Sequence, residues 1–373
     1  MFELIQLRVQ FIIMRQKCVK LDAVLPNAVK YKQAMSVSPS PILPPFAAIR
    51  AAIERNQTFY ITTHVGPDGD AIGPALALKT ALENLGKTVT YVSRDGVPQS
   101  SQFVARADQV LLSAPEGTRF DCAFVLDCDG TPARVASAYE PISGAKERVM
   151  IDHHRTSKPI FETNWIDPSQ AATAMMVYQL LCEFEWPIDV GMAQGLLMGL
   201  SCDTGHFRFD NTSAEVLAAA AYLVERGADA AQIAFRLFDE RSFISTQLLG
   251  IALSKMQSAN AGQLVWTDLT YNDFLSVGAT DESVENVVNF LRYCKGARFA
   301  IIFRERRDEN GVTASISVRS VPELRADLFA NEFGGGGHTV AAGFRIKGNF
   351  ERNVEEVLGR AQEWIEEKHE LVA

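Results

Sequence analysis

Histidine and aspartate residues gather at four places along the chain, each directly after an apolar stretch. These residues are His64, Asp68, Asp70, Asp127, Asp152, His153, His154 and Asp203. Carboxylates and imidazoles together suit Mn²⁺, Mg²⁺, Fe²⁺ or Zn²⁺ better than a metal that prefers thiolates. Carboxylates crowded together without a cation would repel one another and raise several of their pKa values. The residue types therefore favour a divalent-metal site, and two ions about 3.5–4 Å apart suit the hydrolysis of phosphoesters.

Each cluster taken alone is also ordinary turn chemistry. The stretch D-G-D at 68–70 has the composition of a polar turn, since Asp and Gly favour turns. The metal interpretation depends instead on the order of the four clusters, because a full structural unit separates each from the next. If the clusters end neighbouring strands or helices of a parallel sheet, they converge on one edge.

Alternating strand and helix patterns begin at Thr58. Strands are predicted at 59–64, 88–93, 121–127 and 147–154, and helices at about 75–86, 171–185, 189–201 and 213–226. Short apolar strands joined by helices indicate a parallel sheet with helices on both faces, which is an α/β fold. In such sheets ligands bind at the carboxyl ends of the strands.

The pattern changes after residue 229, which predicts a second domain. A first domain at 46–229 is followed by a helical linker at 230–258 and by a smaller α/β domain at 259–373. Strands of the second domain read Q-L-V-W-T-D-L, A-R-F-A-I-I-F-R and V-T-A-S-I-S-V-R. The stretch R-E-R-R-D-E-N-G at 304–311 is interpreted as a solvated hairpin turn. A glutamate-rich surface helix is expected at about 350–368.

Length and composition describe an ordinary two-domain protein. The chain has 373 residues, of which 47% are hydrophobic, and one core usually serves about 100–200 residues. The formal charge of −9 argues against a protein that clamps long duplex nucleic acid. No apolar run approaches the ~20 residues of a membrane span. The six cysteines form no C-x-x-C pair, so we expect reduced core residues in a cytoplasmic protein.

The first 45 residues are expected to be a poorly ordered extension. They hold six Lys/Arg and two Asp/Glu, so that the rest of the chain carries a charge of −13. The stretch S-V-S-P-S-P-I-L-P-P then breaks regular structure. The apolar start has no small-residue cleavage site in the usual place. Met35 is an alternative translation start, which N-terminal sequencing would test.

Five motifs, taken in order, resemble a known family. The stretches H-V-G-P-D-G-D-A-I-G, V-L-D-C-D, D-H-H-R and D-T-G-H-F-R-F resemble the four motifs of the DHH phosphoesterases. The stretch G-G-G-G-H at 334–338 resembles the DHHA1 domain that accompanies them. The resemblance covers roughly residues 47–368, and the layout is most similar to the nano-RNase/pAp-phosphatase group. Gly66 and Pro74 depart from the family pattern, but neither is a ligand position.

The resemblance implies a role for each clustered residue. One ion would be held by His64, Asp68 and Asp127, and a second ion by Asp70, Asp127, His153 and Asp203, with Asp127 bridging. His154 would face the scissile phosphate as a donor, and Asp152 would orient its neighbours. Arg155 would either orient the D-H-H turn or contact the substrate. Mn²⁺ is the implied metal, two ions per subunit, with Mg²⁺ or Co²⁺ as alternatives.

The second domain is expected to recognise the substrate. Glycines allow backbone N–H groups to approach an anion closely, and arginine makes bidentate contacts with phosphate. The expected substrate-binding residues are Arg319, Ser320, Gly335, Gly336, Gly337 and His338. The resemblance places these residues near the terminal phosphate or nucleotide of the substrate.

The substrates implied by the resemblance are short. They are single-stranded oligoribonucleotides of a few residues, 3′-phosphoadenosine 5′-phosphate, and cyclic or linear dinucleotides such as c-di-AMP and pApA. A manganese pyrophosphatase shares the metal motifs, but the G-G-G-G-H stretch argues against it. A non-catalytic nucleotide-binding module would lack ligands, whereas every expected ligand position is filled here. The family resemblance also allows a homodimer.

Overall fold

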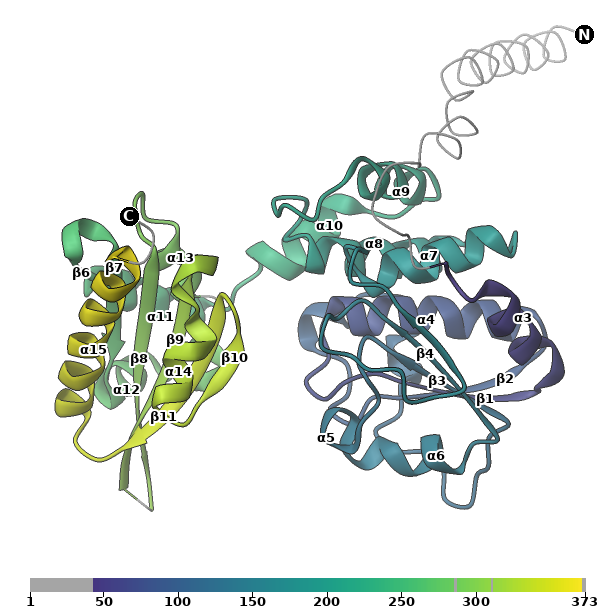
Figure 1. Cartoon of the computed structure of the whole chain (residues 1–373), viewed down its shortest axis with the longest axis horizontal. Coiled ribbons are helices and arrows are strands. Elements are labelled where there is room, and N and C mark those ends of the chain that lie inside the picture. The colour runs from purple at the N-terminus through teal and green to yellow at the C-terminus, as the bar shows by residue number, and fades with distance from the viewer. Residues whose placement is uncertain (1–42, 285–286, 310, 371–373) are drawn as a thin grey trace, which may run out of the picture. The chain divides into compact units, whose positions relative to one another are not determined.

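The chain folds into two compact units that divide between Asp239 and Glu240 (Figure 1). The computed structural model describes residues 43–284, 287–309 and 311–370. The extension expected at 1–45 therefore lies almost wholly outside the described residues. The division between the units falls inside the predicted helical linker, 230–258, and the exact domain limits stay a prediction.

A five-stranded parallel sheet forms the centre of the first unit. Its strand order is β2-β1-β3-β4-β5. The strands are β1 (Thr58–Thr62), β2 (Thr88–Val92), β3 (Cys122–Leu126), β4 (Glu147–Asp152) and β5 (Thr163–Ile166). The first four confirm the sequence prediction, and the central ones are apolar runs, as parallel strands between two helical layers must be. The sequence pattern does not indicate β5, because four residues are too few to show a strand periodicity.

Helices cover both faces of this sheet (Figure 1). They are α3 (Phe46–Arg55), α4 (Gly69–Asn84), α5 (Pro132–Val135), α6 (Tyr139–Gly144), α7 (Thr173–Glu183), α8 (Val190–Asp203), α9 (Ala214–Glu225) and α10 (Ala230–Ala234), with short 3₁₀ turns η1 (Gln99–Ser101), η2 (Ala107–Gln109) and η3 (Ala136–Ala138) and a π-helical turn η4 (Phe235–Asp239). The main core joins Phe59, Phe124 and Trp165 to α3, α4, α7 and α8. A smaller core around Tyr60 lies under α5 and α6 on the opposite face.

Helix α4 begins at Gly69, whereas the sequence pattern predicts a start at Ala75. Gly73 and Pro74 usually break helices, which is why the pattern places the D-G-D stretch in a turn. Gly73 is required here for packing, since a Cβ at this position would lie 2.0 Å from the carbonyl oxygen of Gly195 in α8. The close contact between α4 and α8 therefore outweighs local propensity, and it places Asp70 inside a helix.

A six-stranded mixed sheet, of order β10-β11-β9-β8-β7-β6, forms the second unit. Its strands are β6 (Gln257–Ala259), β7 (Leu264–Leu269), β8 (Phe299–Asp308), β9 (Gly311–Ser320), β10 (Gly336–His338) and β11 (Ala341–Lys347). Its helices are α11 (Phe243–Ser254), α12 (Tyr271–Val277), α13 (Val287–Arg292), α14 (Ala326–Glu332) and α15 (Phe350–Glu370), with 3₁₀ turns η5 (Asn260–Gly262), η6 (Asp281–Val284) and η7 (Pro322–Leu324). This confirms the predicted α/β class of the second domain.

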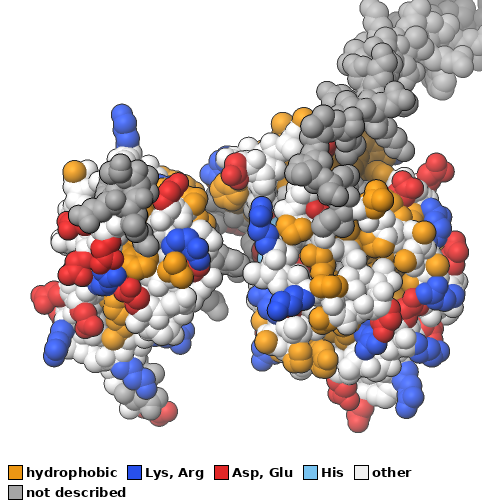
Figure 2. All heavy atoms as spheres, viewed as in Figure 1, with side chains coloured by type: hydrophobic (Ala, Val, Ile, Leu, Met, Phe, Trp, Pro, Cys, Tyr) orange, Lys and Arg blue, Asp and Glu red, His pale blue; other side chains and the backbone are white. Residues whose placement is uncertain are grey.

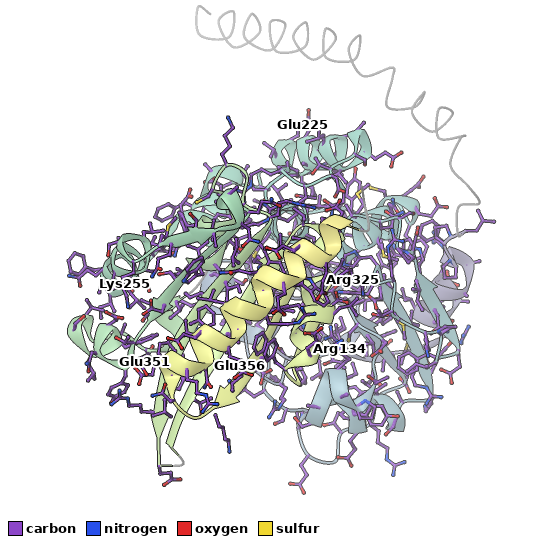
Figure 3. The ribbon with its side chains drawn as sticks, turned by 60° about the vertical axis from the view of Figure 1, so that its left-hand side comes forward. Arg134, Glu225, Lys255, Arg325, Glu351 and Glu356 are labelled. Atoms are coloured by element: carbon purple, nitrogen blue, oxygen red, sulfur yellow. The ribbon has the colours of Figure 1, made fainter. Side chains whose placement is uncertain are left out.

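The two faces of this second sheet have separate cores. Phe299 packs with Phe329 of α14 and Trp364 of α15 on one face. Ile302 packs with residues of α11, α12 and α13 on the other. Figure 3 shows α15 lying across the sheet with Glu351 and Glu356 on it. Both glutamates are exposed, as expected for a glutamate-rich surface helix.

The charged stretch at 304–308 lies in a strand. β8 extends to Asp308 and β9 starts at Gly311, with Arg304 opposite Ser315 in the register. The prediction of a solvated turn at 304–311 is therefore wrong for 304–308. Glu305 shows the physical reason, because this charged side chain is buried and accepts a hydrogen bond of 2.8 Å from the backbone N–H of Tyr271. A buried, paired carboxylate cannot be told from a solvated one by sequence.

Among the described cysteines, burial varies more than expected. Cys122 and Cys128 are buried in the cores of the first unit, as predicted. Cys202 and Cys294 are half-buried. Cys182, the penultimate residue of α7, is exposed, so the prediction of a core residue is wrong there. These five residues form no disulfide.

Charges of both signs are interspersed on the surface. Figure 2 shows Lys/Arg and Asp/Glu side chains mixed over the visible face of each unit, without a continuous basic stripe. Within the described ranges, no helix is both long and apolar enough to span a membrane.

Candidate metal centre

The carboxyl ends of three neighbouring strands meet the ends of two helices at one edge of the first sheet. β1 pairs with β3 and β3 with β4, all in parallel. His64 follows β1, Asp127 follows β3, and Asp152 ends β4 ahead of His153 and His154. Asp68 and Asp70 come from the start of α4, and Asp203 is the last residue of α8. The predicted convergence of the four clusters is therefore present.

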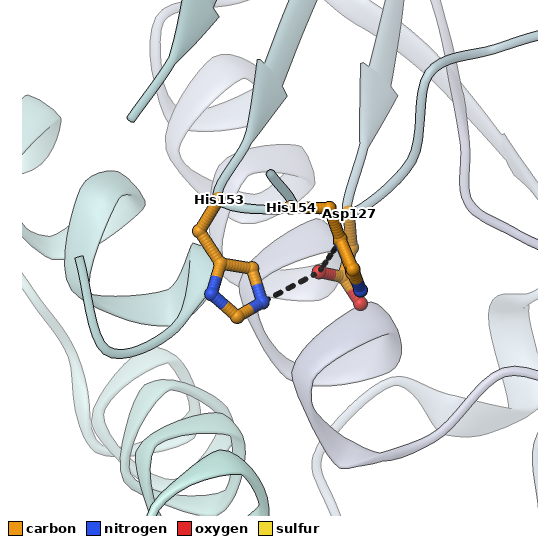
Figure 4. Close-up of side chains that lie close together, drawn as sticks. All are labelled: Asp127, His153 and His154. Atoms are coloured by element: carbon orange, nitrogen blue, oxygen red, sulfur yellow. Dashed lines mark ion pairs between the residues drawn. The ribbon is translucent and has the colours of Figure 1, made fainter. Parts of the chain in front are cut away.

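Asp127 lies at the middle of this group. Its Oδ2 is 3.3 Å from Nε2 of His64, and its Oδ1 is 3.6 Å from Nε2 of His153. Oδ1 is also 3.8 Å from Nδ1 of His154, as Figure 4 shows for the three side chains that it draws. Asp127 has a left-handed backbone, with φ of 62°, and is 2% exposed. Left-handed residues other than glycine are uncommon and gather at functional sites.

The candidate ligands form two main groups around Asp127. His64, Asp68 and Asp127 offer ligand atoms within 4.8 Å of one another, and so do Asp70, His153 and Asp203. The two oxygens of Asp127 face the histidines of different groups. This is the geometry that a bridging carboxylate requires.

Two histidines have the orientation of metal ligands. The Nδ1 of His64 lies 2.9 Å from the carbonyl oxygen of Val65, and the Nδ1 of His153 lies 3.4 Å from that of Gln170. A backbone carbonyl that accepts from Nδ1–H fixes the ring and turns the Nε2 lone pair toward a metal. The Nε2 of His153 is buried and has no hydrogen bond, although it lies 3.0 Å from Oδ2 of Asp203. A cation between these atoms would supply the missing partner.

The electrostatics of the site also fit divalent cations. Burial raises the pKa of Asp70 well above its usual range, and the carboxylates of Asp203 and Asp127 raise it further. Burial likewise raises the pKa of Asp203. Burial opposes protonation of His153, but the surrounding carboxylates raise its pKa to about 10. In the absence of metal, protons therefore offset the crowded charges, and divalent ions would displace these protons on binding.

Backbone and side-chain donors hold the carboxylates in place. Asp68 caps α4, since its Oδ1 accepts from the N–H groups of Asp70 and Ala71 at 2.9 and 3.2 Å. Asp70 accepts from the N–H groups of Thr173 and Ala174 at 2.6 and 2.8 Å. The hydroxyl of Thr173 donates to Oδ1 of Asp127 at 2.9 Å. Each of these three carboxylates is therefore held by donors at the start of α4 or α7.

Asp152 and His154 form a pair beside the two groups. The Oδ1 of Asp152 is 2.7 Å from Nδ1 of His154 and accepts the backbone N–H of His154 at 3.1 Å. Ser157 donates its hydroxyl to the other oxygen. The hydrogen bond to Asp152 is the main cause that raises the pKa of His154, against the effect of burial. This geometry fits the expected orienting role of Asp152.

Other residues bear on the site in different ways. Arg155 is exposed and forms no hydrogen bond or ion pair with the described part of the chain, and its role stays a prediction. Sequence reasoning did not identify Thr173, Gln170 or Ser157. The available signal was weak, namely two polar residues, Gln170 and Thr173, flanking an apolar helix start.

Arg319 and Ser320 lie at the end of β9 in the second unit. The guanidinium of Arg319 donates to the carbonyl of Val318 at 3.1 Å, and burial lowers its pKa. The hydroxyl of Ser320 accepts the N–H of Ala326 at 3.1 Å and lies 3.4 Å from the carbonyl oxygen of Thr339. Ser320 therefore anchors the start of α14, while Arg319 keeps most of its donors for other partners.

The glycine-rich segment is an edge strand rather than a loop. Residues Gly336–His338 form β10, which pairs with β11, and the N–H of Gly335 donates to the carbonyl of Ala330 at 2.9 Å. A Cβ on Gly335 or Gly337 would lie 2.3 or 2.4 Å from a carbonyl oxygen of β11. These glycines are thus required for close strand packing, and an edge strand still leaves one side of its backbone unpaired.

Comparisons with known proteins identify related chains. Residues 58–200 match the DHH family, N-terminal domain, and residues 269–367 match the DHHA1 domain. The chain is 36% identical over 309 residues to the bifunctional oligoribonuclease and PAP phosphatase NrnA of Thermus thermophilus, covering 82% of this chain and 89% of that protein. It is 24% identical to the cyclic-di-AMP phosphodiesterase GdpP of Bacillus subtilis, covering 87% of this chain but 50% of that protein.

A solved structure supports the fold. The exopolyphosphatase-related protein of Bacteroides fragilis superposes with a TM-score of 0.80 at 24% identity. The match covers 88% of this chain and 97% of that one. The fold of that protein is therefore shared with this chain.

Proposed function

Since this chain belongs to the DHH family of phosphoesterases and carries a DHHA1 domain, we propose that it is a two-metal hydrolase of short oligoribonucleotides and 3′-phosphoadenosine 5′-phosphate (PAP). The observation that carries this proposal is the position of Asp127. Its two carboxylate oxygens face His64 and His153, which belong to different ligand groups.

The ligand groups would hold two divalent ions, for which we propose Mn²⁺. His64 and Asp68 would serve one ion, and Asp70, His153 and Asp203 the other, with Asp127 between them. Two bound ions supply a water nucleophile at neutral pH and stabilise charge on the oxygens of a phosphoester. The protein's part is to hold the ligands rigidly, which Thr173, Val65 and Gln170 do through the hydrogen bonds described above.

His154 would act on the substrate rather than on metal. Its Nδ1 is engaged by Asp152, so Nε2 is the atom left for a phosphoryl oxygen. The raised pKa of His154 favours the imidazolium form, which can donate from Nε2 to developing negative charge. Asp152 positions this ring and keeps it charged.

Short substrates are favoured by the charge distribution. The whole chain carries a formal charge of −9, which does not suit a long polyanion. Individual cations, such as Arg155 in the first unit and Arg319 in the second, suit one or a few phosphates instead. The Thermus thermophilus relative is named a bifunctional oligoribonuclease and PAP phosphatase, which agrees with this choice of substrates.

A panel of substrates tests the proposal. With Mn²⁺ supplied, PAP, a dinucleotide, a five-residue RNA and a 24-residue RNA are each incubated with the protein, and released phosphate or mononucleotide is measured. We expect turnover of PAP, the dinucleotide and the five-residue RNA, and little of the 24-residue RNA. Turnover of none of the first three would overturn the proposal.

A second candidate is hydrolysis of c-di-AMP or its linear product pApA, which the similarity to the cyclic-di-AMP phosphodiesterase favours. The panel therefore includes both dinucleotides, with inorganic pyrophosphate as a further arm. A kcat/KM for c-di-AMP above those for PAP and the five-residue RNA would make this candidate the main activity.

A further inference from the structure

One face of the sheet in the second unit carries basic side chains in register. Arg304 of β8 stands opposite Ser315 of β9, which stands opposite Arg345 of β11. Residues opposite one another in a sheet point to the same face, so these three side chains form one row. Arg319 lies on the same face, four residues along β9 from Ser315.

The arginines of this row have no acidic partner. The Nη2 of Arg304 donates to the hydroxyls of Ser315 and Ser317 at 3.2 and 2.8 Å, and its Nε is buried without a hydrogen bond. Arg345 is exposed, and it lies close enough to Arg304 to contribute to the lowered pKa of that residue, whose main cause is burial. Neither arginine forms an ion pair with any described carboxylate. A buried, unpaired donor on a cation costs free energy, which an anion would offset.

Small residues lie between the two basic positions of the sheet. Ser317 of β9, Gly343 of β11 and Gly336 of β10 follow one another in the register between the Arg319 row and the Arg304 row. All three residues are small, and Gly336 is exposed. A phosphate or sugar can therefore approach the sheet closely here, with arginine on either side.

We propose that Arg304 and Arg345 form a second phosphate subsite, which binds the chain of an oligoribonucleotide beyond the group held by Arg319. This inference rests on the proposed function. Four residues of an antiparallel strand extend roughly 14 Å, a spacing that suits two separate phosphates. The hydroxyls of Ser315 and Ser317 orient the guanidinium of Arg304, and Arg345 supplies an exposed bidentate donor.

Two phosphate subsites in one unit distinguish the two classes of substrate. PAP carries two phosphate groups, one of which is hydrolysed. At most one phosphate is then left for an arginine contact, and Arg319 suffices for it. Only an oligoribonucleotide has a further phosphate for Arg304 and Arg345, so this subsite selects substrates by length.

The test compares kcat/KM for a five-residue RNA and for PAP in the full chain with Mn²⁺. Arg345→Gln should lower kcat/KM for the RNA about 5- to 30-fold through KM, which converts to about 1–2 kcal/mol. It should change the value for PAP less than about twofold. Arg345→Lys should recover part of the loss. The salt dependence of kcat/KM for the RNA should weaken by about 0.7 in the logarithmic slope, as for one lost phosphate contact on a single strand.

Arg352→Gln is the matched control, because Arg352 is an exposed arginine on α15, a helix that packs on the opposite face of the same sheet. It should alter neither substrate. Equal losses for PAP and RNA in Arg345→Gln, or no loss for either, would overturn the subsite while leaving the proposed function intact. A wild-type protein that cleaves neither substrate would instead overturn the proposed function. The kcat/KM of Arg304→Gln for the same two substrates gives a second measurement of this row. The melting temperature of the variant shows whether it is folded.

Discussion

Thr173 donates a hydrogen bond from its hydroxyl to Oδ1 of Asp127 at 2.9 Å. The backbone N–H of the same residue donates to Oδ2 of Asp70 at 2.6 Å. One residue at the start of α7 therefore orients a carboxylate in each of the two ligand groups. Thr173 is fully buried, so water cannot replace its hydroxyl easily.

Replacement of Thr173 by valine tests this relationship. Thr173→Val keeps the shape of the side chain but removes the donor to Asp127, so the bridging carboxylate loses its orientation. We expect metal affinity or kcat to fall about 10- to 100-fold, the range typical of groups that orient metal ligands. Thr173→Ser keeps the hydroxyl and should stay within a few-fold of wild type. Metal titration followed by turnover would measure both, and an active valine variant with unchanged affinity would contradict the role.

The pH profile should depend on Asp152. The hydrogen bond to Asp152 raises the pKa of His154, so the imidazolium form persists to a higher pH than in a free histidine. Activity that needs this form is present below the raised pKa and is lost as pH rises through it. Asp152→Asn should lower the pKa of His154 and move the alkaline limb of kcat/KM to lower pH. At a fixed pH above the limb, kcat/KM should fall about tenfold for each pH unit by which the limb moves.

Ser157→Ala is the control for this profile, because the hydroxyl of Ser157 donates to the oxygen of Asp152 that does not bond the imidazole. Its alkaline limb should move less than that of Asp152→Asn. An alkaline limb at the same pH in wild type and Asp152→Asn would show that His154 does not act as an imidazolium.

Metal removal should destabilise the protein more at high pH than at low pH. Burial and neighbouring carboxylates raise the pKa of Asp70, and burial raises that of Asp203, so the folded metal-free state binds protons more tightly than the unfolded state. The contribution of these two carboxyls to the stability of the metal-free protein is therefore greatest at acid pH and falls as pH rises above the ordinary carboxyl range. Bound divalent ions remove this loss. The difference in melting temperature between Mn²⁺-loaded and EDTA-treated protein should grow from pH 5 to pH 8, and a difference that shrinks would contradict the crowded-carboxylate account.

Sequence reasoning predicted the first domain well because its signals are local and repeated. Asp127 and His153 could be assigned to one edge because each follows an apolar strand, and parallel strands end on the same side. Thr173 could not be assigned, since its role depends on how the start of α7 meets α4 in space. The start of α4 was also hidden, because the contact of Gly73 with Gly195 that permits a glycine and a proline in a helix is tertiary.

The second domain was harder to predict from sequence. The charges of Arg304 and Glu305 have the pattern of a solvated turn, but they alternate between two faces of a long strand. The glycines at 335–337 have the composition of a phosphate loop, whereas Gly335 and Gly337 are required by the close approach of β11. In both cases the residue types were informative. Their structural role depends on the strand register, which could not be predicted from the sequence.

The glycine-rich strand gives a prediction about stability. A Cβ at Gly335 would lie 2.3 Å from the carbonyl oxygen of Gly343 and 2.4 Å from Cβ of Phe344. Gly335→Ala should therefore destabilise the protein by about 1–3 kcal/mol, as overpacking does. At Gly336 the nearest atom to an added Cβ is Oδ1 of Asn331 at 3.7 Å, so Gly336→Ala should leave the melting temperature nearly unchanged. Equal melting temperatures for the two variants would contradict the strand packing.

The proposed function requires that Asp127 bridge two metal ions that hydrolyse a phosphoester. Asp129→Ala is a matched control, because Asp129 lies two residues away and bonds only to Thr131 among the described residues. The most direct test measures bound Mn²⁺ per chain together with release of mononucleotide from a five-residue RNA. We expect two ions and turnover in wild type and Asp129→Ala, and a reduced ion count with turnover abolished in Asp127→Ala. Two ions and wild-type turnover in Asp127→Ala would contradict it.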